Sequence, residues 1–151
     1  MLSAHSLYLH TEATNMRQTL TIAVDFDGTI VEHAYPKIGK PILFAVETLK
    51  ALQKRNHRLV LWTIREGRYL EEAIAYCEKQ GLTFYAINET FPGEGFEEGQ
   101  SRKVNVDLFI DDRNIGGLPP WGEIWKMIEG DEMEMAKEAS KKGFLQRIFG
   151  G

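Results

Sequence analysis

The chain contains little of what several protein classes require. Its 151 residues include one cysteine, Cys77, so no internal disulfide can form, which predicts a reducing compartment such as the cytoplasm. Lys and Arg total 18 against 22 Asp and Glu, and the formal charge of −4 disfavours general nucleic-acid binding. No apolar run approaches the roughly 18 residues of a membrane span, so no membrane partner is expected.

The ends of the chain differ from its middle. Residues 1–18 are polar and lack the basic start and apolar stretch of a secretory signal, so they are predicted to be a flexible N-terminal extension. Met16 is an equally good candidate for the true start. Residues 19–130 have the length and the patterns of one domain. Residues 131–151 form a charged tail that ends in apolar side chains, as in an amphipathic helix that docks on the domain or on a partner.

Strand and helix patterns alternate through the domain. Apolar runs predict strands at 20–26, 58–63, 83–87 and 104–110. Helical spacing predicts a helix opening at Pro41, a second over about 68–80 that ends at Gly81, and a short third after Pro119-Pro120. Alternating strands and helices imply an α/β fold, a Rossmann-like three-layer sandwich with a central parallel sheet and right-handed crossovers.

The motif Asp25-Phe26-Asp27-Gly28-Thr29 follows the first predicted strand. Alternation along a strand would send both Asp side chains to one side. At about 4 Å, two like charges repel by roughly 4 kcal/mol at an effective dielectric constant near 20. A divalent cation or one shared proton would remove most of that cost. The motif therefore predicts a metal site, acid–base chemistry, or both.

Other polar residues stand at the ends of later strands. Thr63 closes the second strand, Asp111 and Asp112 close the fourth, and Lys103 precedes the fourth. Because ligands bind at the carboxyl ends of the strands in parallel sheets, these side chains are expected to face one cleft. Arg65 follows Thr63 closely and could bind a substrate phosphate bidentately, or pair with Glu66 or solvent.

In this order, the motifs resemble those of the haloacid dehalogenase superfamily of phosphohydrolases, over about residues 20–117. The resemblance implies that Asp25 is the nucleophile, which forms an aspartyl-phosphate, and that Asp27 acts as general acid and then as base. It also implies Mg²⁺ as cofactor. The remaining implied roles are metal binding by Asp25, the backbone carbonyl of Asp27, Asp111 and Asp112, and phosphate binding by Thr63 and Lys103, with Arg65 as a further candidate.

Many members of that superfamily carry a cap domain over the site. Here the two insertion points hold only Ile30–Lys40 and Asn88–Ser101, so the chain resembles a capless member. An open site implies a phosphorylated small molecule or an exposed phosphate on a larger substrate, or a cleft closed by a second subunit of a homo-oligomer.

Two other functions remain open. Thr63-x-Arg65-Glu66 and Ile110-Asp111-Asp112-Arg113 weakly resemble the phosphatase half of polynucleotide kinase, which would make the chain a 3′-phosphatase of nucleic-acid ends; its acidic balance disfavours this. A phosphorylatable, metal-binding module similar to response-regulator receivers also gathers acids, a hydroxyl and a lysine at strand ends. The four histidines show no grouping typical of metal ligands and are interpreted as surface or core residues.

Overall fold

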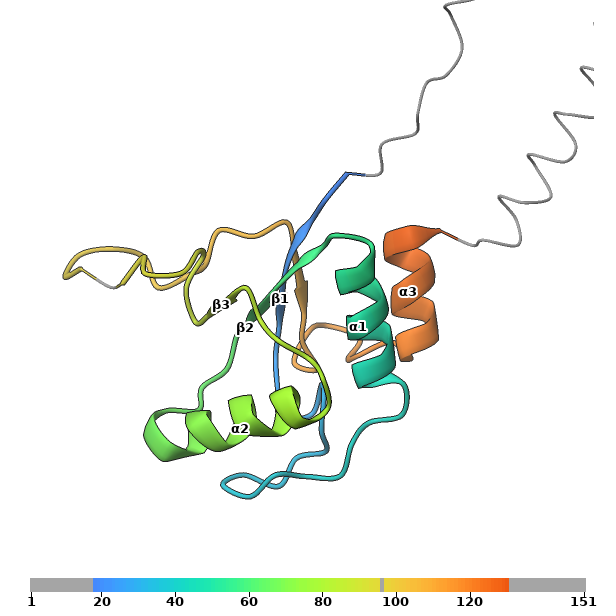
Figure 1. Cartoon of the computed structure of the whole chain (residues 1–151), viewed down its shortest axis with the longest axis horizontal. Helices are drawn as coiled ribbons and strands as arrows, with labels where there is room; N and C mark the ends of the chain where they lie inside the picture. The colour runs from blue at the N-terminus through green and yellow to red at the C-terminus, as the bar shows by residue number, and fades with distance from the viewer. Residues whose placement is uncertain (1–17, 96, 131–151) are drawn as a thin grey trace, which may run out of the picture.

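A computed structural model describes residues 18–95 and 97–130 of the chain (Figure 1). Its sheet has four parallel strands in the order β3-β2-β1-β4, so β1 lies between β2 and β4. Ile22 of β1 is in register with Leu59 of β2 and Leu108 of β4. The α/β fold class expected from the sequence is confirmed. The strands are β1 (Thr21–Val24), β2 (Arg58–Leu61), β3 (Ala86–Ile87) and β4 (Leu108–Ile110).

Three helices pack on this sheet: α1 (Ala45–Lys54), α2 (Gly67–Lys79) and α3 (Trp121–Glu129). In Figure 1, α1 and α3 lie side by side, and they are in contact. Alternate strand residues form one buried cluster with the apolar faces of all three helices. That cluster includes Ile22, Val24, Leu59, Leu61, Leu49, Leu52, Ala73, Cys77, Trp121 and Ile124. Ala23 and Val60 alternate to the opposite face and are also buried, so both faces are covered, as in a Rossmann-like sandwich.

Several element boundaries differ from the sequence predictions. The first helix begins at Ala45, not at Pro41, because Pro41 pairs with Val31 in an isolated bridge and Phe44 adopts a left-handed conformation (φ 65°). The third and fourth strands are shorter than expected, β3 having two residues and β4 three. Both are edge strands, which have a hydrogen-bonding neighbour on one side only. The second helix ends as predicted, since Gly81 has a φ of 75°.

Other sequence predictions concern the ends and the core. The proposed N-terminal extension, with Met16, and the proposed tail helix over 131–151 lie outside the described residues. Cys77 is buried on the inner face of α2, and burial raises the pKa of its thiol to about 12. Within the described part of the chain, no helix is long and apolar enough to cross a membrane.

The strand order locates the site. From β1 the chain adds β2 and then β3 on one side, and then returns to place β4 on the other side of β1. The sheet therefore reverses its direction of growth between β1 and β4. Ligands in open parallel sheets bind beside such a reversal, at the carboxyl ends of the strands. Asp25 follows the carboxyl end of β1, and Asp111 follows that of β4.

Candidate active site

Three carboxylates meet at this reversal point. Val24 of β1 is in register with Ile110 of β4, so the chain leaves both strands side by side, and the amide of Asp25 donates to the carbonyl of Ile110 at 3.0 Å. Asp25, Asp111 and Asp112 each offer one oxygen within 4.8 Å of the other two. The structure thus brings together three of the four residues that the sequence assigned to a metal.

Thr29 joins the two loops that carry these acids. Its hydroxyl donates to Oδ2 of Asp25 at 3.2 Å and accepts the backbone N–H of Asp112 at 3.1 Å. Its carbonyl accepts the indole N–H of Trp121 at 3.2 Å, which ties the loop to α3. Thr29 is fully buried. Thr29 is part of the sequence motif, but no role was predicted for it. We assign it the role of fixing Asp25 relative to Asp112.

The surroundings of Asp25 oppose its negative charge. Burial, together with the nearby charges of Asp111 and Asp112, raises the pKa of Asp25 from its ordinary 3.8 to about 6. Burial is the largest cause, and hydrogen bonds from the Phe26 amide and Thr29 partly offset it. A cation bound among the three carboxylates would reverse the balance and favour the ionised form.

Asp112 has one oxygen satisfied and one without a partner. Its Oδ2 lies 2.8 Å from Nε2 of His33, whereas its buried Oδ1 has no hydrogen-bond partner among the described residues. Buried polar oxygens are rarely left without a partner, so this one fits a ligand. Three carboxylates that converge on one point suit a hard divalent cation such as Mg²⁺.

His33 was expected to be an ordinary surface or core residue, and its contact with Asp112 was missed. It reaches Asp112 because Gly28 (φ 88°) has no side chain between them. A Cβ at Gly28 would overlap Nε2 of His33 and lie 2.6 Å from Oδ2 of Asp112. No sequence pattern could indicate this contact, because it depends on how residues 29–40 fold back toward β4.

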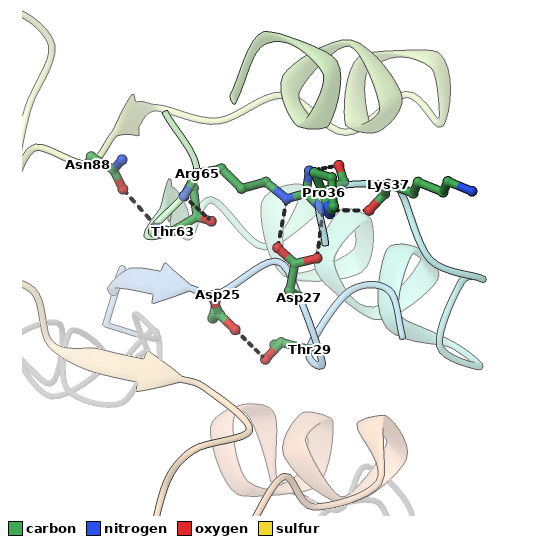
Figure 2. Close-up of polar contacts among 8 residues, drawn as sticks. All are labelled: Asp25, Asp27, Thr29, Pro36, Lys37, Thr63, Arg65 and Asn88. Carbon is green, nitrogen blue, oxygen red and sulfur yellow. Dashed lines mark hydrogen bonds and ion pairs between the residues drawn. The ribbon is translucent and has the colours of Figure 1, made fainter. Parts of the chain in front are cut away.

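Asp27 has a different environment from Asp25 (Figure 2). Its two oxygens accept hydrogen bonds from Arg65, Oδ2 from Nε at 2.6 Å and Oδ1 from an Nη at 2.7 Å. Alternation had predicted that both carboxylates point to one side. Both carboxylates do line the cavity described below, but their hydrogen-bond partners differ. Asp25 contacts Thr29, whereas Asp27 contacts Arg65. Metal binding through the Asp27 backbone carbonyl stays a prediction.

Arg65 does not lie where its expected phosphate-binding role would place it. The side chain is fully buried. It also donates to the carbonyls of Pro36 at 3.0 Å and Lys37 at 2.7 Å, and its guanidinium carbon lies 5.0 Å from the Phe26 ring centroid and 5.2 Å from that of Tyr35. In the described structure its hydrogen bonds go to the protein, so it would not reach a phosphate without leaving Asp27.

Thr63 lies at the expected strand end and lines the cavity described below. Its backbone N–H donates to Oδ1 of Asn88 at 2.8 Å, and its hydroxyl accepts the amide of Arg65 at 3.2 Å (Figure 2). Asn88 follows β3, so a fourth strand end contributes to the site, and the sequence patterns did not indicate this residue. Its left-handed φ of 54° is a conformation that Asn adopts more readily than most residues.

A cavity of about 500 Å³ connects these groups. Asp25, Asp27, Thr63 and Asp111 line it, and so does His33. Its cationic lining comes from Arg102 and Arg113.

Lys103, the expected phosphate-binding lysine, does not line the cavity in the described structure. Its Nζ lies 5.8 Å from the ring centroid of Phe109, while its neighbour Arg102 faces the cavity. Of these two adjacent basic residues, Arg102 and not Lys103 lines the cavity.

No protein-family model matches the chain, and no curated protein matches it. A solved structure does match, that of a conserved protein from Bacteroides thetaiotaomicron, with 61% sequence identity and a TM-score of 0.70. The match covers 74% of this chain and 91% of that one. The chain belongs to the same family as this conserved protein. The description of the relative states no activity, so a function for this family must come from the site itself.

Proposed function

We propose that the chain is a magnesium-dependent phosphohydrolase that works through an aspartyl-phosphate on Asp25. The observation that carries the proposal is the group of three converging carboxylates, in which the buried Oδ1 of Asp112 lacks a hydrogen-bond partner among residues 18–95 and 97–130. Such a group favours a bound cation, and its position at the strand reversal is where parallel sheets bind ligands. The resemblance of the motifs to phosphohydrolases supplies the reaction class.

Asp25 is the proposed nucleophile. The hydrogen bond from Thr29 holds its side chain, and its partial burial reduces its contact with water. An oxygen of the ionised carboxylate attacks phosphorus, and the bond from phosphorus to the leaving group breaks. Asp111 and Asp112 would hold the Mg²⁺ together with Asp25. When bound, the ion neutralises charge on the phosphoryl oxygens.

The remaining lining suits the phosphoryl group. The hydroxyl of Thr63 and the guanidinium of Arg102 or Arg113 are donors on the wall of the same cavity. Donors that face the phosphoryl oxygens stabilise the charge that develops on them during transfer. Asn88 and Arg65 contribute by fixing the Thr63 loop.

Sheet order weighs against the receiver-like alternative. Receivers have the order 2-1-3-4-5, in which strand 3 neighbours strand 1. Here β3 lies outside β2, and β4 neighbours β1. The 3′-phosphatase alternative has no comparable support, since the chain carries a net charge of −4. We place the protein in the cytoplasm, in keeping with its single, buried cysteine.

The proposal is tested by phosphate release from p-nitrophenyl phosphate and a panel of other phosphorylated compounds, including 3′-phosphorylated oligonucleotides, with Mg²⁺ and with chelator. We expect release that requires the metal. Absence of release from every compound, at a Mg²⁺ concentration that saturates the protein by calorimetry, would contradict a phosphohydrolase. Release from the oligonucleotides alone would favour the 3′-phosphatase.

A further inference from the structure

The cavity has apolar lining that the proposed transfer of a phosphoryl group does not use. Its volume of about 500 Å³ is typical of pockets that bind a whole small molecule. Trp62 and Ile64, the two neighbours of Thr63 in the chain, both line it. A phosphoryl group and its Mg²⁺ require polar and charged partners, so these two apolar side chains are available to the organic part of a substrate.

Trp62 differs from the other two tryptophans of the chain. Trp121 belongs to the buried core cluster, and Trp125 packs against that cluster. Among the described residues, Trp62 is neither in the cluster nor among the hydrophobic side chains packed on it; it is half-buried and lines the cavity. Core packing therefore does not account for this ring. A large, flat ring on the wall of a cavity is a typical surface for packing the ring of a ligand.

Ile64 lies on a loop whose neighbouring positions are fixed. The backbone N–H of Thr63 donates to Oδ1 of Asn88 at 2.8 Å, and the side chain of Arg65 is fully buried. Between these two residues, the side chain of Ile64 is 78% exposed. A ligand that covered Ile64 and Trp62 would remove apolar surface from water without having to order the loop.

We infer that the substrate of the proposed phosphohydrolase is a phosphomonoester of an alcohol that carries an aromatic ring, and that this ring packs on Trp62 and Ile64. The inference rests on the proposed function and narrows its substrate class. Thr63 is the proposed donor to the phosphoryl group, and consecutive Cα atoms lie only about 3.8 Å apart. The ring is therefore expected to follow the ester oxygen after a short link.

The test compares kcat/KM of the full chain with Mg²⁺ for 2-phenylethyl phosphate and ethyl phosphate. Both esters release a primary alcohol of similar basicity, so they differ mainly in the ring. Burial of a ring against apolar side chains typically strengthens binding by about 10-fold or more, and we expect at least that preference for 2-phenylethyl phosphate.

A smaller preference, or use of neither ester by a protein that hydrolyses p-nitrophenyl phosphate, would overturn the inference and leave the phosphohydrolase intact. No hydrolysis of any of the three compounds would overturn both.

A variant comparison examines the apolar lining directly. Trp62→Ala removes the flat surface, so the preference for 2-phenylethyl phosphate over ethyl phosphate should fall by about 5-fold or more. A preference that survives in this variant would overturn the inference. If Trp62→Ala fails to fold, Ile64→Ser decides, because Ile64 is exposed and its replacement should lower the preference by about 3-fold or more.

Ile115→Ser is the matched control for Ile64→Ser. Ile115 is also a highly exposed isoleucine, and it lies outside the described lining of this cavity. We expect this variant to keep the preference of the wild type. An equal loss of preference in Ile115→Ser and Ile64→Ser would place the ring elsewhere and overturn the inference.

Discussion

Asp25 and Asp27 belong to one motif, but they have different partners on the two sides of the cavity. On the β4 side, Asp25 lies with Asp111 and Asp112, and Oδ1 of Asp112 has no hydrogen-bond partner within the described part of the chain. On the β2 side, Asp27 is paired with Arg65, and the fully buried guanidinium is satisfied by protein atoms. Charge is left uncompensated on the first side and is neutralised on the second. This difference suggests that the first side receives a cation and a substrate, whereas the second side holds the loops in place.

The largest effect is expected from Asp25→Asn, which removes the proposed nucleophile and keeps its size. Loss of a nucleophile typically costs on the order of 10⁴-fold or more in kcat, and we expect at least that loss in Mg²⁺-dependent phosphate release. Asp107→Asn is the matched control, because Asp107 is exposed and precedes the amino end of β4. Comparable activity in the two variants would contradict the role of Asp25.

Arg65→Met removes the ion pair with Asp27 on the β2 side of the cavity. It leaves the Asp27 carboxylate in place without its counter-ion, and we expect the free energy of unfolding in urea to fall by about 3–5 kcal/mol. Arg68→Met is the control, since Arg68 is an exposed arginine three residues away and should change stability by no more than about 0.5 kcal/mol. Equal stability of the two variants would mean that the buried pair does not hold the loops.

Metal binding should depend only on the carboxylates of the β4 side, which are Asp25, Asp111 and Asp112. At Mg²⁺ one hundred times its Kd, the wild type should gain about 2.7 kcal/mol in unfolding free energy. Asp112→Asn replaces a charged ligand by a neutral amide and should lose most of this gain, whereas Asp107→Asn should keep it. Thermal unfolding with and without Mg²⁺ measures both. A gain retained in Asp112→Asn would exclude Asp112 from the metal site.

A further effect is a pH dependence of stability without metal. The pKa of Asp25 is about 6 in the folded chain and 3.8 ordinarily, so between these values the folded state binds more protons than the unfolded state. Its contribution to stability is therefore present below pH 3.8 and is lost as the pH rises through about 6. In chelator, Asp25→Asn should match the wild type at low pH and exceed it above pH 6. Urea unfolding across this range measures the difference, and a difference independent of pH would contradict the shifted pKa.

Much of the site could be predicted, because the carboxyl ends of parallel strands lie at one edge of the sheet and bring the residues that follow them together. Asp25 and Asp111 follow strands directly, Thr63 comes two residues after β2, and their convergence depends on the strands being parallel and adjacent. The buried alternation of Ile22 and Val24 made the central strand equally predictable. These features are set by local patterns and by one general rule on strand ends.

The rest could not be predicted because it depends on how loops fold. The pairing of Arg65 with Asp27 requires the segment 29–40 to present its carbonyls to the guanidinium. The choice of Arg102 over Lys103 depends on which of two adjacent side chains a long loop turns inward. The contact of His33 with Asp112 spans 79 positions and has no signature in the sequence.

The most direct test of the central claim is to find the covalent intermediate. The protein is incubated with Mg²⁺ and acetyl phosphate, quenched in acid, digested, and analysed by mass spectrometry. The account predicts one phosphoryl group, on Asp25, which is absent when Mg²⁺ is chelated and absent in Asp25→Asn. Metal-dependent turnover with no phosphoryl group on the protein, or with one on another residue, would contradict it.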